Sequence, residues 1–218
     1  MMEPLLKKKV RTYAIHISLF IVTFCCATLA GAEWIHAKLT FLQGMSLSEI
    51  LDGLSYSVPF LAILTCHEFG HYFTARYYGL RVSYPFFIPL WFFGVYPSIG
   101  TMGAVIQIKS QIRSRMQFFD IGVAGPLAGF VIAIIVLLYG FTHLPPQEYI
   151  FDIHPEYEKY GLQYEEYVYK DMSEQAKIGV GTNLLFEFFK AYVVENPERI
   201  PNPYELFHYP VLFSGFLA

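Results

Sequence analysis

The sequence predicts an α-helical multi-span membrane protein with a small membrane-associated β-element between the second and third spans. Of its 218 residues, 55% are hydrophobic and only 15% are charged, whereas a soluble domain has about 25% charged residues. Three apolar runs are also long enough to cross a bilayer core of roughly 30 Å. These two observations make the lipid bilayer the predicted surrounding. The net charge of −3 gives no reason to expect a nucleic-acid partner.

The first span is predicted within residues 1–53, which also hold a basic N-terminus and a short outer loop. Its apolar run covers residues 13–32 and ends in Ala30-Gly31-Ala32. Small residues in this spacing are also typical of a signal-peptidase site. A retained helix is the preferred interpretation, and a cleaved one is the alternative. In both cases the chain after Ala32 begins outside the cytoplasm.

Residues 54–79 form the predicted second span and residues 120–144 the third. Basic residues follow the second span and precede the third, as the positive-inside rule predicts for cytoplasmic ends. Together with those before the first span, 9 of the 15 Lys and Arg residues flank such ends. The N-terminus is therefore predicted to lie in the cytoplasm.

Residues 80–119 are apolar but unsuited to a spanning helix. Pro85 and Pro89 remove backbone donors, and Gly100 and Gly103 interrupt the run. The β-branched residues at 105–108 favour short strands. We expect a re-entrant β-element, which a membrane tolerates only where protein or water covers its backbone. An interfacial loop with no special role is the alternative.

The third span begins with small residues. Gly125 and Gly129 are four apart, a spacing that lets another helix approach closely. Pro126 is tolerable near a helix start, where the N–H groups have no partner. Asp120 is predicted to be the N-cap of this helix, in preference to a metal ligand.

The acidic residues are concentrated outside the spans. Between residues 145 and 209 lie 12 of the 18 Asp and Glu residues, in a predicted extracytoplasmic loop. An amphipathic helix near residues 182–194 is expected along the outer interface. Its predicted apolar face consists of Leu184, Leu185, Phe188, Phe189 and Tyr192. Residues 210–218 are apolar again and resemble the start of a further, truncated span.

The second span contains His67-Glu68-Phe69-Gly70-His71. On a helix, His67 and His71 lie one turn apart on the same face and can hold one metal ion. Zinc suits imidazole ligands, so Zn²⁺ is the predicted cofactor. Glu68 lies about 100° around the helix and can act as general base on a zinc-bound water. Each charged group at the centre of a span costs about 2.5–3.5 kcal/mol, which favours chemistry as the reason for this motif.

A polar pair bonded to a neighbouring helix, without metal, is the alternative for this motif. Gly70 would let another backbone approach. The remaining histidines are isolated and predicted to be interfacial or solvated rather than ligands: His16, His36, His143, His154 and His208. Three cysteines without framework spacing predict no disulfide.

The histidine motif on a membrane helix resembles the site-2 protease family of intramembrane zinc metalloproteases. Residues 100–106 resemble the family's β-element, residues 120–129 its Ala-Gly-Pro helix start, and residues 208–215 the lead-in to its last core helix. The resemblance implies that His67 and His71 bind Zn²⁺ and that Glu68 is the catalytic base. It also implies cleavage of a membrane-protein substrate helix near the cytoplasmic side. The predicted location of the protein is the cytoplasmic (inner) membrane. Residues 103–108 would hold the unwound substrate by strand addition.

One departure from the family concerns the third zinc ligand. The family uses an aspartate in an Asp-Gly motif on a helix after the outer loop, and no such motif occurs before Ala218. A catalytic zinc site has three protein ligands. We therefore expect a fragment that lacks its third ligand, or a ligand from an unexpected place such as Asp120. Residues 1–218 alone are expected to bind zinc weakly and to be inactive.

Two other functions are compatible with the sequence. A non-catalytic membrane scaffold could retain this fold without the third ligand. A coding frame that continues beyond Ala218 with Asp-Gly in an apolar run would favour the protease. A transporter would require further broken helices and solute flux that is independent of Glu68.

Overall fold

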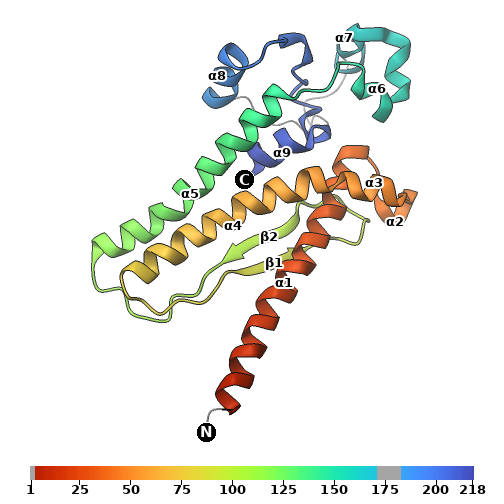
Figure 1. Ribbon diagram of the computed structural model, residues 1–218. Coiled ribbons are helices and arrows are strands. Elements are labelled where there is room, and N and C mark those ends of the chain that lie inside the picture. Colours follow the sequence, from red (N-terminus) through yellow and green to blue (C-terminus); the bar gives the residue numbers. More distant parts are fainter. Residues whose placement is uncertain (1–2, 171–182) are drawn as a thin grey trace.

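Three long helices dominate the computed structural model, which describes residues 3–170 and 183–218 (Figure 1). These are α1 (Glu3–His36), α4 (Leu54–Tyr77) and α5 (Arg115–Thr142). Each lies in a helical segment long and apolar enough to cross a membrane. A two-stranded sheet lies between α4 and α5 in the chain. The predicted fold class is confirmed.

The sheet is antiparallel and consists of β1 (Phe86–Leu90) and β2 (Gly100–Val105). Its register shifts between Phe87 and Pro89, where the proline has no N–H to give to a ladder. An isolated bridge between Val82 and Ile108 continues the pairing toward α4 and α5. The β-branched run at residues 105–108 therefore overlaps β2 only at Val105 and otherwise follows it. Figure 1 shows the hairpin running between α1 and α4.

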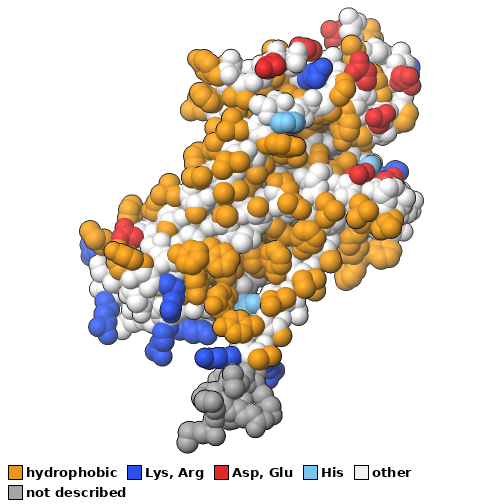
Figure 2. Space-filling view, in the orientation of Figure 1, with side chains coloured by type: hydrophobic (Ala, Val, Ile, Leu, Met, Phe, Trp, Pro, Cys, Tyr) orange, Lys and Arg blue, Asp and Glu red, His pale blue; other side chains and the backbone are white. Residues whose placement is uncertain are grey.

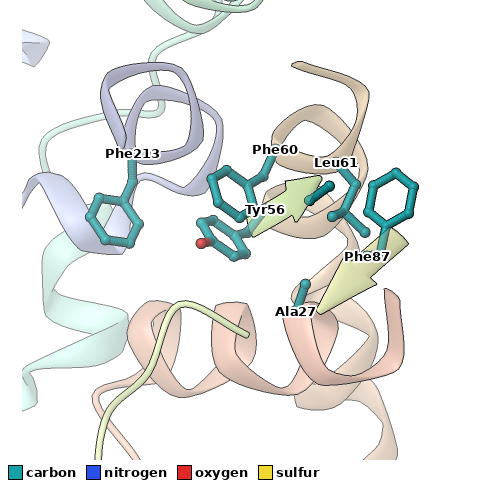
Figure 3. Close-up of a cluster of buried hydrophobic side chains, with 7 residues drawn as sticks. Ala27, Tyr56, Phe60, Leu61, Phe87 and Phe213 are labelled. Carbon is teal, nitrogen blue, oxygen red and sulfur yellow. The ribbon is translucent and has the colours of Figure 1, made fainter. Parts of the chain in front are cut away.

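A buried cluster joins α1, α4, β1 and α9 (Pro210–Leu217). Figure 3 shows Ala27, Tyr56, Phe60, Leu61, Phe87 and Phe213 converging from these elements. A Cβ at Gly31 would lie 2.6 Å from Tyr56 Cδ1, so only glycine lets this ring approach α1. The small residues around Gly31, which also fit a cleavage site, thus form a packing surface.

Gly70 on α4 was expected to let another backbone or a substrate approach, and this backbone belongs to α5. A Cβ at Gly70 would lie 2.4 Å from the carbonyl oxygen of Ala124. The backbones of the two helices therefore meet at Gly70, as small residues in membrane helices permit. This expectation for Gly70 is confirmed.

The start of α5 differs from the prediction. The helix begins at Arg115, and the Ser114 side chain accepts a hydrogen bond from the Met116 N–H as its N-cap. Asp120 lies inside the helix and accepts a hydrogen bond from the Tyr78 hydroxyl. The N-cap prediction for Asp120 is wrong, because Ser114 supplies the cap and the helix starts before Asp120. Pro126 consequently lies in the helix interior and not in the first turn.

The remaining elements are short. They are α2 (Thr40–Gln43), α3 (Leu47–Asp52), α6 (Tyr149–Ile153), η1 (Pro155–Gln163), α7 (Tyr164–Val168), α8 (Leu184–Tyr192), η3 (Pro197–Arg199) and η4 (Leu206–His208). Elements α6 to α8 gather at one end of the molecule, where Figure 2 shows most of the acidic side chains. We call this the acidic end. Residues 171–182 of the predicted loop lie outside the described residues.

Helix α8 is amphipathic, but not with the single face predicted. Phe186 and Phe189 are buried in a cluster with α5 and α9. Leu184, Phe188 and Tyr192 are exposed instead. The apolar residues are thus divided between the protein core and an outward stripe with a four-residue spacing, which an interfacial helix presents to lipid.

Candidate metal centre

Helix α4 brings His67, Glu68 and His71 into one group. Their ligand atoms all lie within 4.8 Å of one another, and the two Nε2 atoms of the histidines are 3.1 Å apart. Tetrahedral zinc with Zn–N bonds of about 2.0–2.1 Å requires nitrogens about 3.3 Å apart. The i, i+4 spacing therefore presents both imidazoles at a separation suited to one zinc ion.

A backbone carbonyl fixes the orientation of the His71 ring. His71 Nδ1 lies 2.6 Å from the carbonyl oxygen of Ile121 on α5. A carbonyl can only accept, so Nδ1 carries the proton and Nε2 keeps its lone pair. Metal-binding histidines commonly use their second nitrogen in this way. The contact with the Ile121 carbonyl therefore supports a fit of these ligands to Zn²⁺, and it does so independently of the sequence motif.

Glycines of α5 make room for the two rings. A Cβ at Gly125 would lie 2.1 Å from His71 Nε2, and one at Gly129 would lie 3.2 Å from His67 Cβ. We call Gly125 and Gly129 the glycine wall. A cavity of about 300 Å³ opens beside His67, between α4 and α5, and reaches Leu185 and Phe216. The predicted role of this glycine pair is confirmed, with histidine rings as the groups that it accommodates.

Glu68 lies apart from the cavity and is buried, with 6% of its surface exposed. The backbone of Ile106, the residue that follows β2, interacts with its carboxylate. The candidate base thus lies beside the end of the β-element, whereas the two histidines face α5. Sequence reasoning missed both Ile106 and Ile121, because each contributes only a backbone group.

Other predicted candidates do not join this group. Asp120 is bonded to Tyr78, and the metal-ligating group found among residues 3–170 and 183–218 contains only the three motif residues. His16 and His208 are buried and hydrogen-bonded to carbonyls of Pro85 and Ile35, so the prediction that they are interfacial or solvated is wrong. Burial lowers the pKa of His208 to about 4.

Three span-length helices and a His-Glu-His group define a membrane protein of the zinc-metalloprotease class. Peptidase family M50 matches residues 55–206, more than half of the 218 residues. The chain therefore belongs to this family, the site-2 protease family.

Curated relatives carry the same class name. A protein of Oryza sativa subsp. indica, "Probable zinc metalloprotease EGY2, chloroplastic", is 35% identical over 103 residues, 47% of this chain and 18% of its own length. The Arabidopsis thaliana protein of that name is 34% identical over 103 residues, 47% of this chain and 17% of its own. "Probable zinc metalloprotease EGY1, chloroplastic" of Oryza sativa subsp. japonica is 32% identical over 133 residues, 54% of this chain and 22% of its own. The chain thus covers about a fifth of these relatives. No solved structure matches it.

Proposed function

We propose that this protein acts as an intramembrane zinc endopeptidase that cleaves peptide bonds within transmembrane segments, in regulated intramembrane proteolysis. The observation that carries the proposal is the His67–Glu68–His71 group on a membrane-length helix, with its two Nε2 atoms 3.1 Å apart. Family membership supports a protease, and the depth of the motif within α4 supports a substrate inside the bilayer.

The residues of this group have separate tasks. His67 and His71 would hold the zinc through Nε2, with His71 kept in place by the Ile121 carbonyl. When bound, zinc acts as a Lewis acid toward the scissile carbonyl and the attacking water. Glu68 accepts a proton from that water as its oxygen bonds to the carbonyl carbon. Glu68 then donates the proton to the leaving amine, so that the peptide bond breaks and the base is regenerated.

Substrate presentation follows from the hairpin. Within the part of the chain that the structure describes, strand β2 pairs with β1 on one side only, in a sheet of two strands. An unwound substrate segment would add to the free edge and satisfy its backbone groups there. Because the backbone of Ile106 interacts with Glu68, the added strand would lie next to the base.

A third zinc ligand is needed in addition to the two histidines. Among the described residues only His67, Glu68 and His71 form the group. We therefore propose that residues 1–218 alone bind zinc weakly and do not cleave substrate. Tight, stoichiometric zinc binding by residues 1–218, together with full cleavage activity, would contradict the proposal.

The proposed location is the cytoplasmic (inner) membrane, with the N-terminus in the cytoplasm. The distribution of charge supports this orientation: Figure 2 shows most Lys and Arg side chains at the end of the molecule opposite the acidic end. Basic residues are retained on the cytoplasmic side of membrane proteins. Labelling of single cysteines introduced at each end tests the orientation.

The test of function is cleavage of a model transmembrane substrate in proteoliposomes, with protein expressed from its full coding sequence. Glu68→Gln removes the base but keeps the size of the side chain, and we expect a loss of at least about 100-fold in the cleavage rate. Glu187→Gln, an exposed glutamate on α8, is the matched control and should cleave normally.

Equal cleavage by Glu68→Gln and Glu187→Gln would rule out the assigned base. No cleavage by any form, including the unaltered protein with zinc, would favour the second candidate. That candidate is a membrane scaffold that keeps the protease fold, and the two-histidine donor set of the described residues is the observation in its favour.

A further inference from the structure

A second cavity, of about 490 Å³, lies where the C-terminal end of α4 meets the start of α5. Three basic residues line it, Arg81, Lys109 and Arg113, and we call it the basic pocket. Its other lining residues are Tyr78, Gly79, Leu80, Ser110, Gln111 and Gln117. The basic pocket lies outside the metal centre, and nothing in the proposed proteolysis uses it.

The positive charges of the basic pocket are not neutralised by the residues that the structure describes. The ion pairs found among residues 3–170 and 183–218 lie elsewhere, around His36, Lys38 and His154. Asp120 is an acid near this end and accepts a hydrogen bond from Tyr78, which lines the pocket. None of the ion pairs among the described residues joins it to the three basic side chains. Three like charges around one cavity repel one another, so a bound anion would stabilise the arrangement.

The walls of the basic pocket are fixed by backbone contacts. The N–H of Lys109 donates to the carbonyl of Arg81 at 2.7 Å, and the N–H of Arg81 donates to Ser110 Oγ at 2.8 Å. Below them Leu80 and Ile121 are buried in an apolar cluster. The basic side chains therefore project from a preformed platform, which lowers the ordering cost of binding a ligand.

The position of the pocket favours a lipid as the source of that anion. Helices α4 and α5 are both long enough to span a membrane. The last residues of α4 and the first residues of α5 lie at this pocket. Large apolar side chains next to the pocket are exposed: Tyr77 is 84% exposed, and Met116 and Phe118 are 69% exposed. A head-group phosphate in the pocket would leave its acyl chains beside these side chains, as basic pockets between membrane helices allow.

We propose that the basic pocket binds the phosphate of an anionic phospholipid head group at this surface of the membrane. The bound lipid would hold the end of α4 against the start of α5. Because α4 carries the histidine motif and α5 carries the glycine wall, the lipid would stabilise the helix pair on which the metal centre depends.

Native mass spectrometry of the detergent-solubilised chain tests the proposal by titration with phosphatidylglycerol or phosphatidylcholine. The triple variant R81Q/K109Q/R113Q should bind phosphatidylglycerol on the order of a hundredfold more weakly, at about fivefold per cation. The matched control K159Q/K190Q/R199Q removes the same number of positive charges from exposed positions at the acidic end, and should bind as the unaltered chain does.

Two further arms keep the test decisive. The single variant Arg113→Gln should bind phosphatidylglycerol about fivefold more weakly than the unaltered chain. Because it changes only one residue, it preserves the test if the triple variant does not fold. Inorganic phosphate at millimolar concentration should not displace the lipid. Equal losses in both triple variants, equal binding of the two lipids, or displacement by inorganic phosphate would each overturn the proposal of a lipid site.

Discussion

Alanine at position 125 tests whether the glycine wall determines metal affinity. The added methyl carbon would lie 2.1 Å from His71 Nε2. Carbon contacts are favourable only near 3.5–4.0 Å, so the ring would have to move by more than about 1 Å. Such a movement would break the 2.6 Å hydrogen bond from His71 Nδ1 to Ile121.

Loss of that orienting hydrogen bond should weaken zinc binding by about 10–100-fold. The effect of Gly125→Ala on the free energy of unfolding is limited, because two contributions oppose each other. Overpacking costs about 1–3 kcal/mol, and replacing glycine by alanine within a helix recovers up to about 1 kcal/mol. Gly125→Ala should therefore fold, with a reduced zinc affinity and a cleavage rate that falls with it.

Helix α5 offers matched controls for this experiment. A Cβ at Gly122 meets nothing within 4 Å, and one at Gly129 would lie 3.2 Å from His67 Cβ. Competition with a chromogenic chelator, on protein expressed from its full coding sequence, should give unchanged zinc affinity for Gly122→Ala, a few-fold loss for Gly129→Ala and the largest loss for Gly125→Ala. Folded Gly125→Ala with the zinc affinity of Gly122→Ala would refute the reasoning.

Three further predictions concern stability in detergent. Ser114→Ala removes the N-cap of α5 and should lower the free energy of unfolding by about 1 kcal/mol; an unchanged melting temperature would contradict this. Tyr164→Phe removes a 2.7 Å hydrogen bond to the buried Glu205 and should cost about 1–3 kcal/mol, whereas Tyr160→Phe, at an exposed ring, should cost little. Burial lowers the pKa of His208 from 6.5 to about 4, so the unfolded chain binds more protons between these values. The stability contributed by neutral His208 is complete above pH 6.5 and is lost as the pH falls toward 4, by at most about 3 kcal/mol. Denaturation from pH 7 to 4 should show this loss in the unaltered protein and not in His208→Gln. Burial raises the pKa of Glu205, an effect of opposite sign that both proteins share.

The sequence predicted the features that depend on local periodicity. The i, i+4 spacing of His67 and His71 is a property of one helix, so it survives in any fold that keeps α4 helical. The apolar length of the spans likewise depends only on neighbouring residues. Gly125 and Gly129 could be assigned to a close contact because a four-residue spacing places them on one helix face.

Features that depend on tertiary contacts were not predictable. His208 appeared isolated, but its Nδ1 atom lies 3.0 Å from the carbonyl of Ile35, 173 residues earlier. Asp120 and Ser114 are both good caps, and residue preference alone could not choose between them. His71 is oriented by the backbone carbonyl of Ile121. Every residue type has a backbone carbonyl, so no sequence pattern marks this one.

If the end of β2 lies beside Glu68, the position of the cut would depend on the number of substrate residues along the strand. It would not depend on the identity of the substrate side chains. A strand advances about 3.3 Å per residue. A substrate strand paired with β2 and shifted by one residue would therefore present the neighbouring peptide bond to the base that lies beside the end of the same strand. Under the proposed mechanism, insertion of one residue in the substrate upstream of its cleavage site should move the cut by one residue, whatever the inserted residue is.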